Sequence, residues 1–342
     1  MKKITMCALA GILGIGTTAY AADQTLISTK ASSPIVLDGM ADKAWGAAEE
    51  IVVTVDNLPY EPNNGYEGMQ ETDVSIKSLY DDNYVYFLIT YADPTKSLER
   101  FPWVKQEDGS WKKLANKDST GHENTYYEDK LAMWWNISTK GFEEEGCMIA
   151  CHLNVPGDKS AGRKYTAAEG ETIDMWHAKY VRSLPMGMFD DQYVDNNTDP
   201  KKNGGYGRKG DTGKGGYTNN DNADQTAPAF MNLNRTEDDK YFVIPSKKVP
   251  FVDTFKAGDV VPGIDIMPMM GGRADILARN HHENGMWTLE VMRSLKTEGE
   301  NAETQDVQFT DMGKTYPFGV AVFDNSQINH LYHLETLELK FQ

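Results

Sequence analysis

Two cysteines and a histidine lie close together in the run Gly146–His152, which reads G-C-M-I-A-C-H. Cys147 and Cys151 are four residues apart and His152 follows directly, so the run is one residue longer than the C-x-x-C-H pattern of covalent haem attachment. In that chemistry two thiols add to the two vinyl groups of a haem, and the adjacent imidazole becomes an axial ligand of the iron. The run predicts one covalently bound haem c, with His152 as the proximal ligand.

The same residue types permit two other interpretations. A zinc site needs a fourth ligand, usually from a second C-x-x-C or H-x-x-x-H pair, and the sequence has no such pair. A disulfide between Cys147 and Cys151 closes almost no loop, so it adds little stability. Both alternatives stay open, and haem is the interpretation that the residues favour.

The first 21 residues indicate export. A short basic start precedes an apolar stretch from Ile4 to Ile15, and Ala19-Tyr20-Ala21 is an A-x-A cleavage site. We expect residues 1–21 to be a signal peptide and the mature chain to reside in the periplasm. Cys7 lies inside the signal, so the mature chain keeps only the paired cysteines.

The chain is strongly acidic, with a formal net charge of −17. Nucleic acid and anionic lipid are poor partners for such a surface, whereas a basic redox protein is attracted to it, although acidity also simply keeps secreted proteins soluble. After the signal no run of 18 or more apolar residues follows, so we expect no membrane span. Residues 22–342 are long enough to bury one full core, and we expect a single domain.

Alternating apolar runs predict an all-β fold. Asp73–Tyr80 and Tyr84–Tyr91 flank a turn-forming D-D-N and predict a hairpin, and the second run is apolar on both faces, as in a central strand. The spacing of the runs favours a β-sandwich with short helices near Asp42–Glu50 and Trp176–Ser183 and with long inserted loops. Further strands are predicted at Leu131–Ile137, Tyr241–Ile244, Met286–Arg293, Phe318–Phe323 and Thr336–Phe341.

The segment 195–228 is rich in Gly, Asn, Asp and Lys and has few apolar residues. Such a composition buries too little apolar surface to offset the entropy of ordering, so we expect a long mobile insertion. Its role remains open: it is a tolerated surface loop, or it is a flap over the haem edge or a docking arm.

Several segments resemble one family in the same order along the chain. They are P-I-V-L-D-G at 34–39, V-S-I-K-S-L-Y-D-D at 74–82, D-M-W-H-A-K at 174–179, the strand from Trp287 to Leu295, and A-V-F-D-N at 321–325 with His330. Through these segments the chain resembles the haem-binding domain of the ethylbenzene dehydrogenase gamma subunit and its relatives. The fold of that family is shared in outline with family 9 carbohydrate-binding modules.

The resemblance implies ligands as well as a fold. Gamma subunits of the molybdenum enzymes bind haem b through one Met and one Lys, without covalent attachment. Here the C-x-x-x-C-H run falls near the Met-bearing loop and His330 near the Lys, which implies a covalent haem with two histidine ligands. His330 is the first choice for the distal ligand, and His177 is the second. His177 has an equally ordinary alternative as a core histidine hydrogen-bonded through one ring nitrogen.

Other candidates have more ordinary roles. Met267, Met269 and Met270 offer thioether ligands, but methionine at this density usually fills gaps in a core. Lys247 and Lys248 are weaker candidates as amine ligands. His281 and His282 are interpreted as solvated residues of a turn.

The sequence contains no catalytic motif that competes with this interpretation. It lacks G-x-S-x-G, H-E-x-x-H and a glycine-rich phosphate loop between a strand and a helix. The carboxylate pairs Asp81-Asp82 and Asp190-Asp191 are interpreted as solvated turns, with a calcium site as the weaker alternative. We therefore expect an electron-transfer protein, not an enzyme.

The expected function is that of a periplasmic monohaem c-type cytochrome that transfers single electrons, with a low potential if His152 and His330 are the ligands. The resemblance implies periplasmic redox partners such as a molybdenum enzyme or a multihaem cytochrome. The alternative is a secreted carbohydrate-binding module of the same sandwich fold without haem. Trp134, Trp135 and Trp176 are its candidate platforms, although burial is the more ordinary role of these tryptophans.

Overall fold

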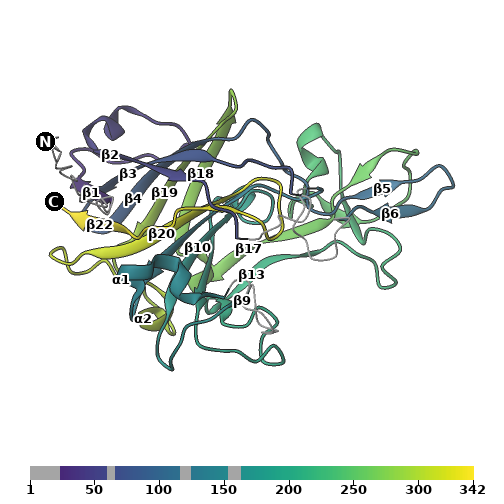
Figure 1. The fold of residues 1–342 in the computed structure, drawn as a ribbon. Coiled ribbons are helices and arrows are strands. Elements are labelled where there is room, and N and C mark those ends of the chain that lie inside the picture. The colour runs from purple at the N-terminus through teal and green to yellow at the C-terminus, as the bar shows by residue number, and fades with distance from the viewer. Residues whose placement is uncertain (1–23, 60–65, 116–124, 153–162) are drawn as a thin grey trace, which may run out of the picture.

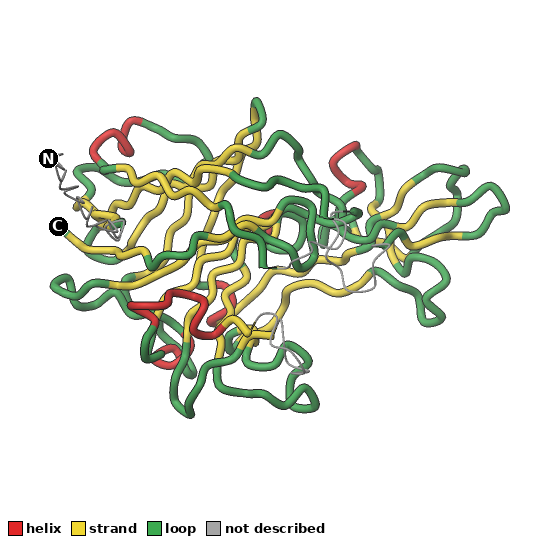
Figure 2. The backbone as a smooth tube through the Cα atoms, viewed as in Figure 1, coloured by secondary structure: helices red, strands yellow, loops and turns green. Residues whose placement is uncertain are grey.

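The structure of the chain is a computed structural model that describes residues 24–59, 66–115, 125–152 and 163–342. The expected signal peptide at residues 1–21 lies outside the described residues. Strands are the main regular secondary structure of the described chain, and its helices are short (Figure 2). None of the helices in this part has the length and apolar character needed to cross a bilayer. The fold is all-β, as the sequence predicts.

Thirteen strands form the main sheet. β2 (Glu50–Val55) pairs with β3, and β21 (Leu331–Tyr332) pairs with β20. Most neighbours are antiparallel, but β1 runs parallel to both β22 and β3. The other strands follow one another in the order β12 (Arg208–Gly210), β11 (Asp190–Val194), β10 (Ile173–Lys179), β7 (Lys130–Asn136), β20 (Tyr316–Phe323), β22 (Leu337–Phe341), β1 (Thr25–Lys30), β3 (Thr72–Tyr80), β4 (Tyr84–Ala92), β19 (Met286–Ser294) and β18 (Ile276–Glu283).

The sheet folds back on itself to form two layers. Phe87 of β4 contacts Trp135 of β7 and Trp176 of β10, and the ring centroids are 5.6 Å apart in both pairs. Four strands separate β4 from β7 in the order of the sheet, so these contacts cross from one layer to the other. Trp135 also stacks on Phe318 at 4.6 Å. The two layers with apolar side chains between them form the expected β-sandwich.

The two ends of the sheet meet at one corner. The backbone N–H of Phe189, just before β11, donates to the carbonyl oxygen of Ile276 in β18 at 3.0 Å, and the N–H of Ala278 donates to Gly187 at 2.9 Å. The edge of β18 is thus partly paired instead of open to other chains.

Four smaller sheets surround the sandwich. β5 and β6 extend from it at the end opposite the two termini (Figure 1). The smaller sheets are β13 (Gly213–Asn219) with β17 (Ile264–Gly271), β14 (Phe230–Asn232) with β15 (Lys248–Pro250), β16 (Val260–Val261) with β5 (Trp103–Lys105) and β6 (Trp111–Lys113), and β8 (Cys151–His152) with β9 (Arg163–Lys164). The helices are α1 (Phe142–Glu145) and α2 (Ala302–Gln305), with 3-10 turns η1 (Lys43–Ala47), η2 (Gly146–Ala150), η3 (Leu184–Met186), η4 (Glu237–Lys240) and η5 (Gly272–Ala274).

The structure confirms most of the predicted strands. β3 and β4 form the predicted hairpin, with Tyr80 opposite Val85, and β4 lies between β3 and β19 as a central strand. Strands β7, β19, β20 and β22 begin and end within two residues of the predicted runs, and η1 lies in the expected short helix.

Two predicted elements are wrong. Trp176–Ser183 is not a helix, because its first half belongs to β10, where Trp176 pairs with Met133 of β7 and packs into the core. Tyr241–Ile244 is not a strand. The side chain of Asn232 hydrogen-bonds Phe242 O at 2.8 Å and Ile244 N at 2.8 Å, so it takes up backbone groups that a sheet would pair.

The segment 195–228 contains β12 and β13. β13 pairs with β17 from Gly213 opposite Gly271 to Asn219 opposite Ile264. A Cβ on Gly215, whose φ is +80°, would lie 2.0 Å from the carbonyl oxygen of Pro268. The glycines that suggest a loop in the sequence therefore permit close pairing of two strands. The mobility of the segment stays a prediction.

Candidate functional site

Cys147 and Cys151 lie on a short irregular segment that covers one face of the sheet. Helix α1 leads into the 3-10 turn η2, which carries Cys147 and ends at Cys151. Cys151 then pairs with Lys164 across the small sheet β8–β9. Both cysteines are free of disulfides, and both residues are half-buried. The side chain of His152 lies outside the part of the structure that is described.

Three strands form the floor beneath the cysteines. In the paired strands β10, β7 and β20, Met175, Trp134 and Gly319 lie side by side, and the next row on the same face consists of His177, Ala132 and Ala321. The small residues of β7 and β20 in these rows leave a hollow of about 40 Å³. Its walls include Cys147, Cys151, Lys164, Phe323, His330 and Tyr332.

The site therefore brings together three residues that the sequence predicts. Cys147, Cys151 and His330 share one cavity, although His330 is far from the cysteines in the chain. A volume of about 40 Å³ holds a water molecule, and a pocket for a cofactor usually measures roughly 300–1,000 Å³. The donor groups suit a haem, but a porphyrin enters only if the segment Phe142–Cys151 moves outward.

Both cysteines are neutral thiols in this environment. Burial raises the pKa of Cys147 to about 12 and also raises the pKa of Cys151. Thiolates are the form that binds zinc. Among the described residues, neither cysteine belongs to a group of three potential metal-ligand atoms.

His330 has a free nitrogen for a ligand. Its Nδ1 lies 2.8 Å from the carbonyl oxygen of Ile328 and donates to it, which leaves the lone pair on Nε2. Metal-binding histidines commonly hold their second ring nitrogen in this way. Burial, followed by the charge of Lys164, lowers the pKa of His330 to about 3, so the imidazole stays neutral.

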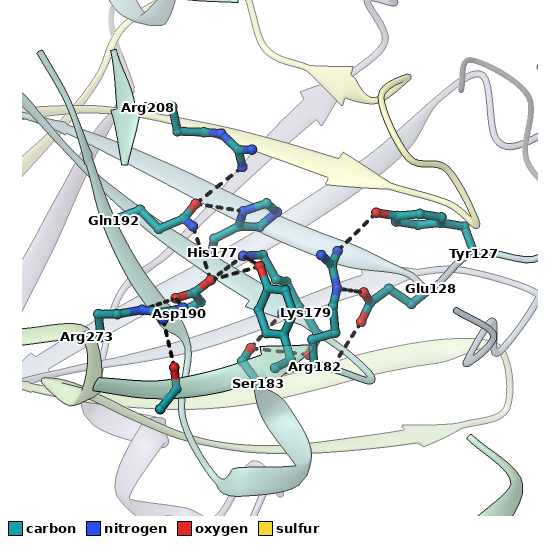
Figure 3. Close-up of polar contacts among 12 residues, drawn as sticks. Tyr127, Glu128, His177, Lys179, Arg182, Ser183, Asp190, Gln192, Arg208 and Arg273 are labelled. Atoms are coloured by element: carbon teal, nitrogen blue, oxygen red, sulfur yellow. Dashed lines mark hydrogen bonds and ion pairs between the residues drawn. The ribbon is translucent and has the colours of Figure 1, made fainter. Parts of the chain in front are cut away.

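His177 lies on the floor but does not line the cavity. Its Nδ1 is 3.3 Å from Oε1 of Gln192 (Figure 3). Its Nε2 is buried and has no hydrogen-bond partner among the described residues. Burial, with the charges of Lys179 and Lys130, holds the pKa well below the ordinary value. The ring of Phe323 contacts both histidines, at 5.9 Å from His177 and 4.7 Å from His330.

A buried ionic network continues from His177. Lys179 and Arg273 both form ion pairs with Asp190, and Arg182 pairs with Glu128 (Figure 3). The sequence interpretation of Asp190-Asp191 as a solvated turn is wrong, because both residues are fully buried on β11. The cationic partners of Asp190 come from the neighbouring strand β10 and from a distant segment of the chain. No local pattern in the sequence therefore indicates the network.

Two lysines lie at or near the cavity. Lys130 is buried, and its Nζ donates to the carbonyl oxygen of Gln327 at 3.0 Å and lies 3.8 Å from the ring centroid of Phe323. Lys164 lines the cavity beside both cysteines. Burial lowers the pKa of each lysine, and no ion pair joins either one to a carboxylate within the described residues. The charged form of both amines is thus disfavoured while no anion lies beside them.

The other candidates lie away from this cavity. Met267 and Met270 are exposed on β17, Met269 is buried there, and none of them lines the cavity. Lys247 and Lys248 form ion pairs with Asp239 and Asp265. His281 and His282 lie on β18 instead of in a turn, and Nε2 of His282 is 3.0 Å from Asp93 O.

The chain also has distant similarity to solved structures. A family 9 carbohydrate-binding module from Caldicellulosiruptor kristjanssonii in complex with glucose is 11% identical, with a TM-score of 0.35 over 93% of this chain and 96% of that one. The same module in complex with cellotriose gives 11% identity and a TM-score of 0.35 over 93% and 95%. No curated protein matches the chain. The family model of ethylbenzene dehydrogenase matches residues 42–334, and the chain therefore belongs to this family.

Proposed function

We propose that this protein is an exported monohaem c-type cytochrome that transfers single electrons. The observation that carries the proposal is the shared cavity of Cys147, Cys151 and His330, in which His330 keeps Nε2 available by donating Nδ1 to Ile328. A haem bound there would supply an iron that changes oxidation state by one electron. The C-x-x-x-C-H run of the sequence adds His152 as the proximal ligand.

The charges around the cavity support an anionic occupant. Haem carries two propionates, and Lys130 and Lys164 are buried amines near the cavity that lack carboxylate partners in the described chain. An anion placed beside them would offset the cost of their burial. A neutral sugar would leave that cost unchanged, so the charge pattern favours the cytochrome over the carbohydrate-binding alternative.

The aromatic residues point the same way. Trp135 and Trp176 are fully buried in the core, and Trp134 is buried beneath the cysteine segment. A sugar platform requires an exposed aromatic face. The three tryptophans named as candidate platforms do not provide one.

Entry of the cofactor would require the segment Phe142–Cys151 to separate from the floor. Polar contacts hold this segment: Thr336 Oγ1 donates to Phe142 O at 3.2 Å, Asn136 Nδ2 donates to Glu143 Oε1 at 3.2 Å, and Tyr165 N donates to Ala150 O at 3.1 Å. Apolar packing of Phe142, Cys147 and Ile149 on the floor adds to them. Covalent attachment during export would replace these contacts with contacts to the porphyrin.

The acidic surface suggests how the protein finds a partner. A formal charge of −17 attracts basic redox proteins over a distance of about 10 Å at 0.1 M salt. We propose a periplasmic redox protein as the partner, with a molybdenum enzyme or a multihaem cytochrome as the classes that the family membership favours. Electron transfer to such a partner would slow as the salt concentration increases.

Expression together with a cytochrome c maturation system tests the proposal. The mature protein is expected to gain the mass of one haem and to keep it after denaturation, with a c-type pyridine haemochrome spectrum. The double variant Cys147→Ala/Cys151→Ala is expected to lose covalent haem. Met148→Ala, in the same segment, is the matched control and keeps it. A colourless wild-type protein whose electrophoretic migration is slowed by oligosaccharide in the gel would overturn the proposal in favour of carbohydrate binding.

A further inference from the structure

A second group of polar residues lies on the opposite side of β10 from the cysteine cavity. Asp174 of β10, Asp191 of β11 and Asp306 after α2 each have a carboxylate oxygen within 4.8 Å of the other two. Asp174 and Asp191 are fully buried and Asp306 is 2% exposed. In β10 the side chains of Asp174 and Trp176 point into the sandwich, whereas Met175 and His177 point toward the cysteines.

The three aspartates leave several oxygens without donors. Within the described residues, neither carboxylate oxygen of Asp191 has a hydrogen-bond partner, nor does Oδ1 of Asp174, and Oδ1 of Asp306 has only the ion pair with Arg293 at 3.5 Å. The remaining oxygens are occupied: Asp174 Oδ2 accepts from Trp176 Nε1 at 3.0 Å and from Val307 N at 3.0 Å. Asp306 Oδ2 accepts from Thr297 Oγ1 at 2.6 Å. The donor-free oxygens are buried acceptors, and each is costly to leave unpaired.

One cation does not balance this charge. Arg293 forms the only ion pairs with the three aspartates in the described part of the chain, at 3.4 Å to Asp174 and 3.5 Å to Asp306. Two further carboxylates add to the repulsion: burial, together with Asp306, raises the pKa of Asp211 to about 10 and that of Asp275 to about 6. Asp191 has no ion pair among these residues, and burial with the neighbouring carboxylates raises its pKa well above the ordinary value.

We propose that Asp174, Asp191 and Asp306 bind a calcium ion. Oxygens that bind one calcium at 2.3–2.6 Å lie within about 5 Å of one another. The carboxylate oxygens of this group lie within 4.8 Å of one another, so their spacing suits one calcium ion. The group contains only oxygen donors, which suit calcium and magnesium and not the softer metals. Calcium also accepts irregular geometry and two oxygens from one carboxylate, which suits the two donor-free oxygens of Asp191.

An open cleft reaches Asp306, one member of the group. A cleft of about 460 Å³ is lined by Asp306 together with Thr212, Gly213, Glu298 and Glu300. Two glutamates at its wall make the entrance electronegative, so a cation is attracted along it. The calcium would join β10, β11 and the segment after α2, and would therefore stiffen the strand that also carries Met175 and His177.

The second acidic group of the protein provides a contrast. Asp93, Asp129 and Asp324 also lie within 4.8 Å of one another. Their oxygens are mostly occupied by donors, including Thr95 N, Ser97 N and Asn325 N at 3.0, 2.8 and 3.0 Å. In this group only Asp93 Oδ2 lacks a partner in the described structure. Asp93→Asn is therefore a matched control for a substitution in the first group.

Terbium luminescence and thermal unfolding test the proposal. The indole of Trp176 donates to Asp174, so excitation of tryptophan is expected to sensitise emission from Tb³⁺ bound there, and calcium is expected to displace it. Asp191→Asn is expected to weaken calcium binding at least tenfold, whereas Asp93→Asn changes it less than twofold. Without calcium, Asp191→Asn is expected to melt above the wild type, because it removes a buried carboxyl group crowded by other carboxyl groups; with calcium the order reverses.

Three results would overturn the proposal. Loss of binding in Asp93→Asn alone would assign the ion to the other acidic group. Unchanged calcium affinity in Asp191→Asn would exclude that residue as a ligand. A wild-type melting temperature that is the same in calcium and in EGTA, with no terbium emission, would show that protons alone neutralise the carboxyl groups. This last measurement needs no variant, so it decides even if Asp191→Asn fails to fold.

Discussion

Gly319 faces Cys147 across the cavity: a Cβ on Gly319 would lie 3.7 Å from both Cβ and Sγ of the cysteine. That distance is an ordinary van der Waals contact. The space between Gly319 and Cys147 therefore accommodates one methyl group and no larger side chain. Gly319 also pairs with Trp134 on β7, and this pairing opposes a shift of β20 away from Cys147. The size of the residue at this position therefore controls the space beneath the thiols.

Gly319→Leu is expected to abolish haem attachment, because its side chain would occupy the space beneath Cys147. Gly319→Ala is expected to keep at least half of the wild-type haem content, because its single methyl group meets Cys147 without overlap. The ratio of haem absorbance to protein in matured samples measures both effects. Full attachment in Gly319→Leu would show that haem lies elsewhere.

His330→Ala is expected to convert a low-spin haem spectrum to a high-spin one, because it removes the nitrogen that the cavity makes available. His177→Ala is expected to leave the spectrum low-spin, because His177 does not line the cavity. Optical spectra of the oxidised proteins compare the two variants. The opposite result would assign the distal position to His177.

In protein produced without haem, we expect His330 to lower the free energy of unfolding as the pH decreases below about 6.5. The folded-state pKa of about 3 is below the unfolded value, so the unfolded chain binds a proton first and gains stability as the pH decreases. One such histidine contributes a slope of about 1.4 kcal/mol per pH unit between the two pKa values. Urea unfolding at several pH values measures the slope.

In His330→Asn the slope of unfolding free energy against pH is expected to be shallower by the contribution of one histidine, about 1.4 kcal/mol per pH unit. The exposed His281 provides a control, and His281→Asn should leave the slope as it is in the wild type. An equal slope in wild type and His330→Asn would contradict the buried neutral state of this imidazole.

Asp190→Asn is expected to destabilise the protein by about 3–5 kcal/mol, because it leaves Lys179 and Arg273 without their shared carboxylate inside the fold. Asp82→Asn removes an ion pair to Lys30 between two exposed side chains and is expected to change stability little. Chemical denaturation of both variants gives the comparison. Similar stabilities for the two would show that the network is solvated.

The parts of the fold that follow local rules are predictable from sequence. The D-D-N turn between two apolar runs specifies the β3–β4 hairpin, because the turn and the alternation agree. The segment Trp176–Ser183 fails for the opposite reason: its local pattern is ambiguous, and pairing with β7 decides its conformation. Asn232 likewise determines the loop at Tyr241–Ile244 through side-chain hydrogen bonds that no periodicity shows.

The candidate site divides in the same way. The spacing of Cys147, Cys151 and His152 can be seen in the sequence because the three residues lie within one short run. Its floor is assembled from β10, β7 and β20, whose small residues Ala132 and Gly319 become meaningful only when the strands align. The acidic group around Asp191 is likewise hidden, since its members come from three separate segments and a D-D pair is ordinarily exposed.

Strand β1 lies between β22 and β3, so the first and last strands of the described chain share one seam. A polypeptide that emerges amino terminus first cannot close this seam until residues 337–341 are available. Until then β1 offers an unpaired edge to any extended segment nearby. The sandwich therefore closes only after β22 has been synthesised, and a nascent chain that ends before this strand keeps β1 unpaired on that side.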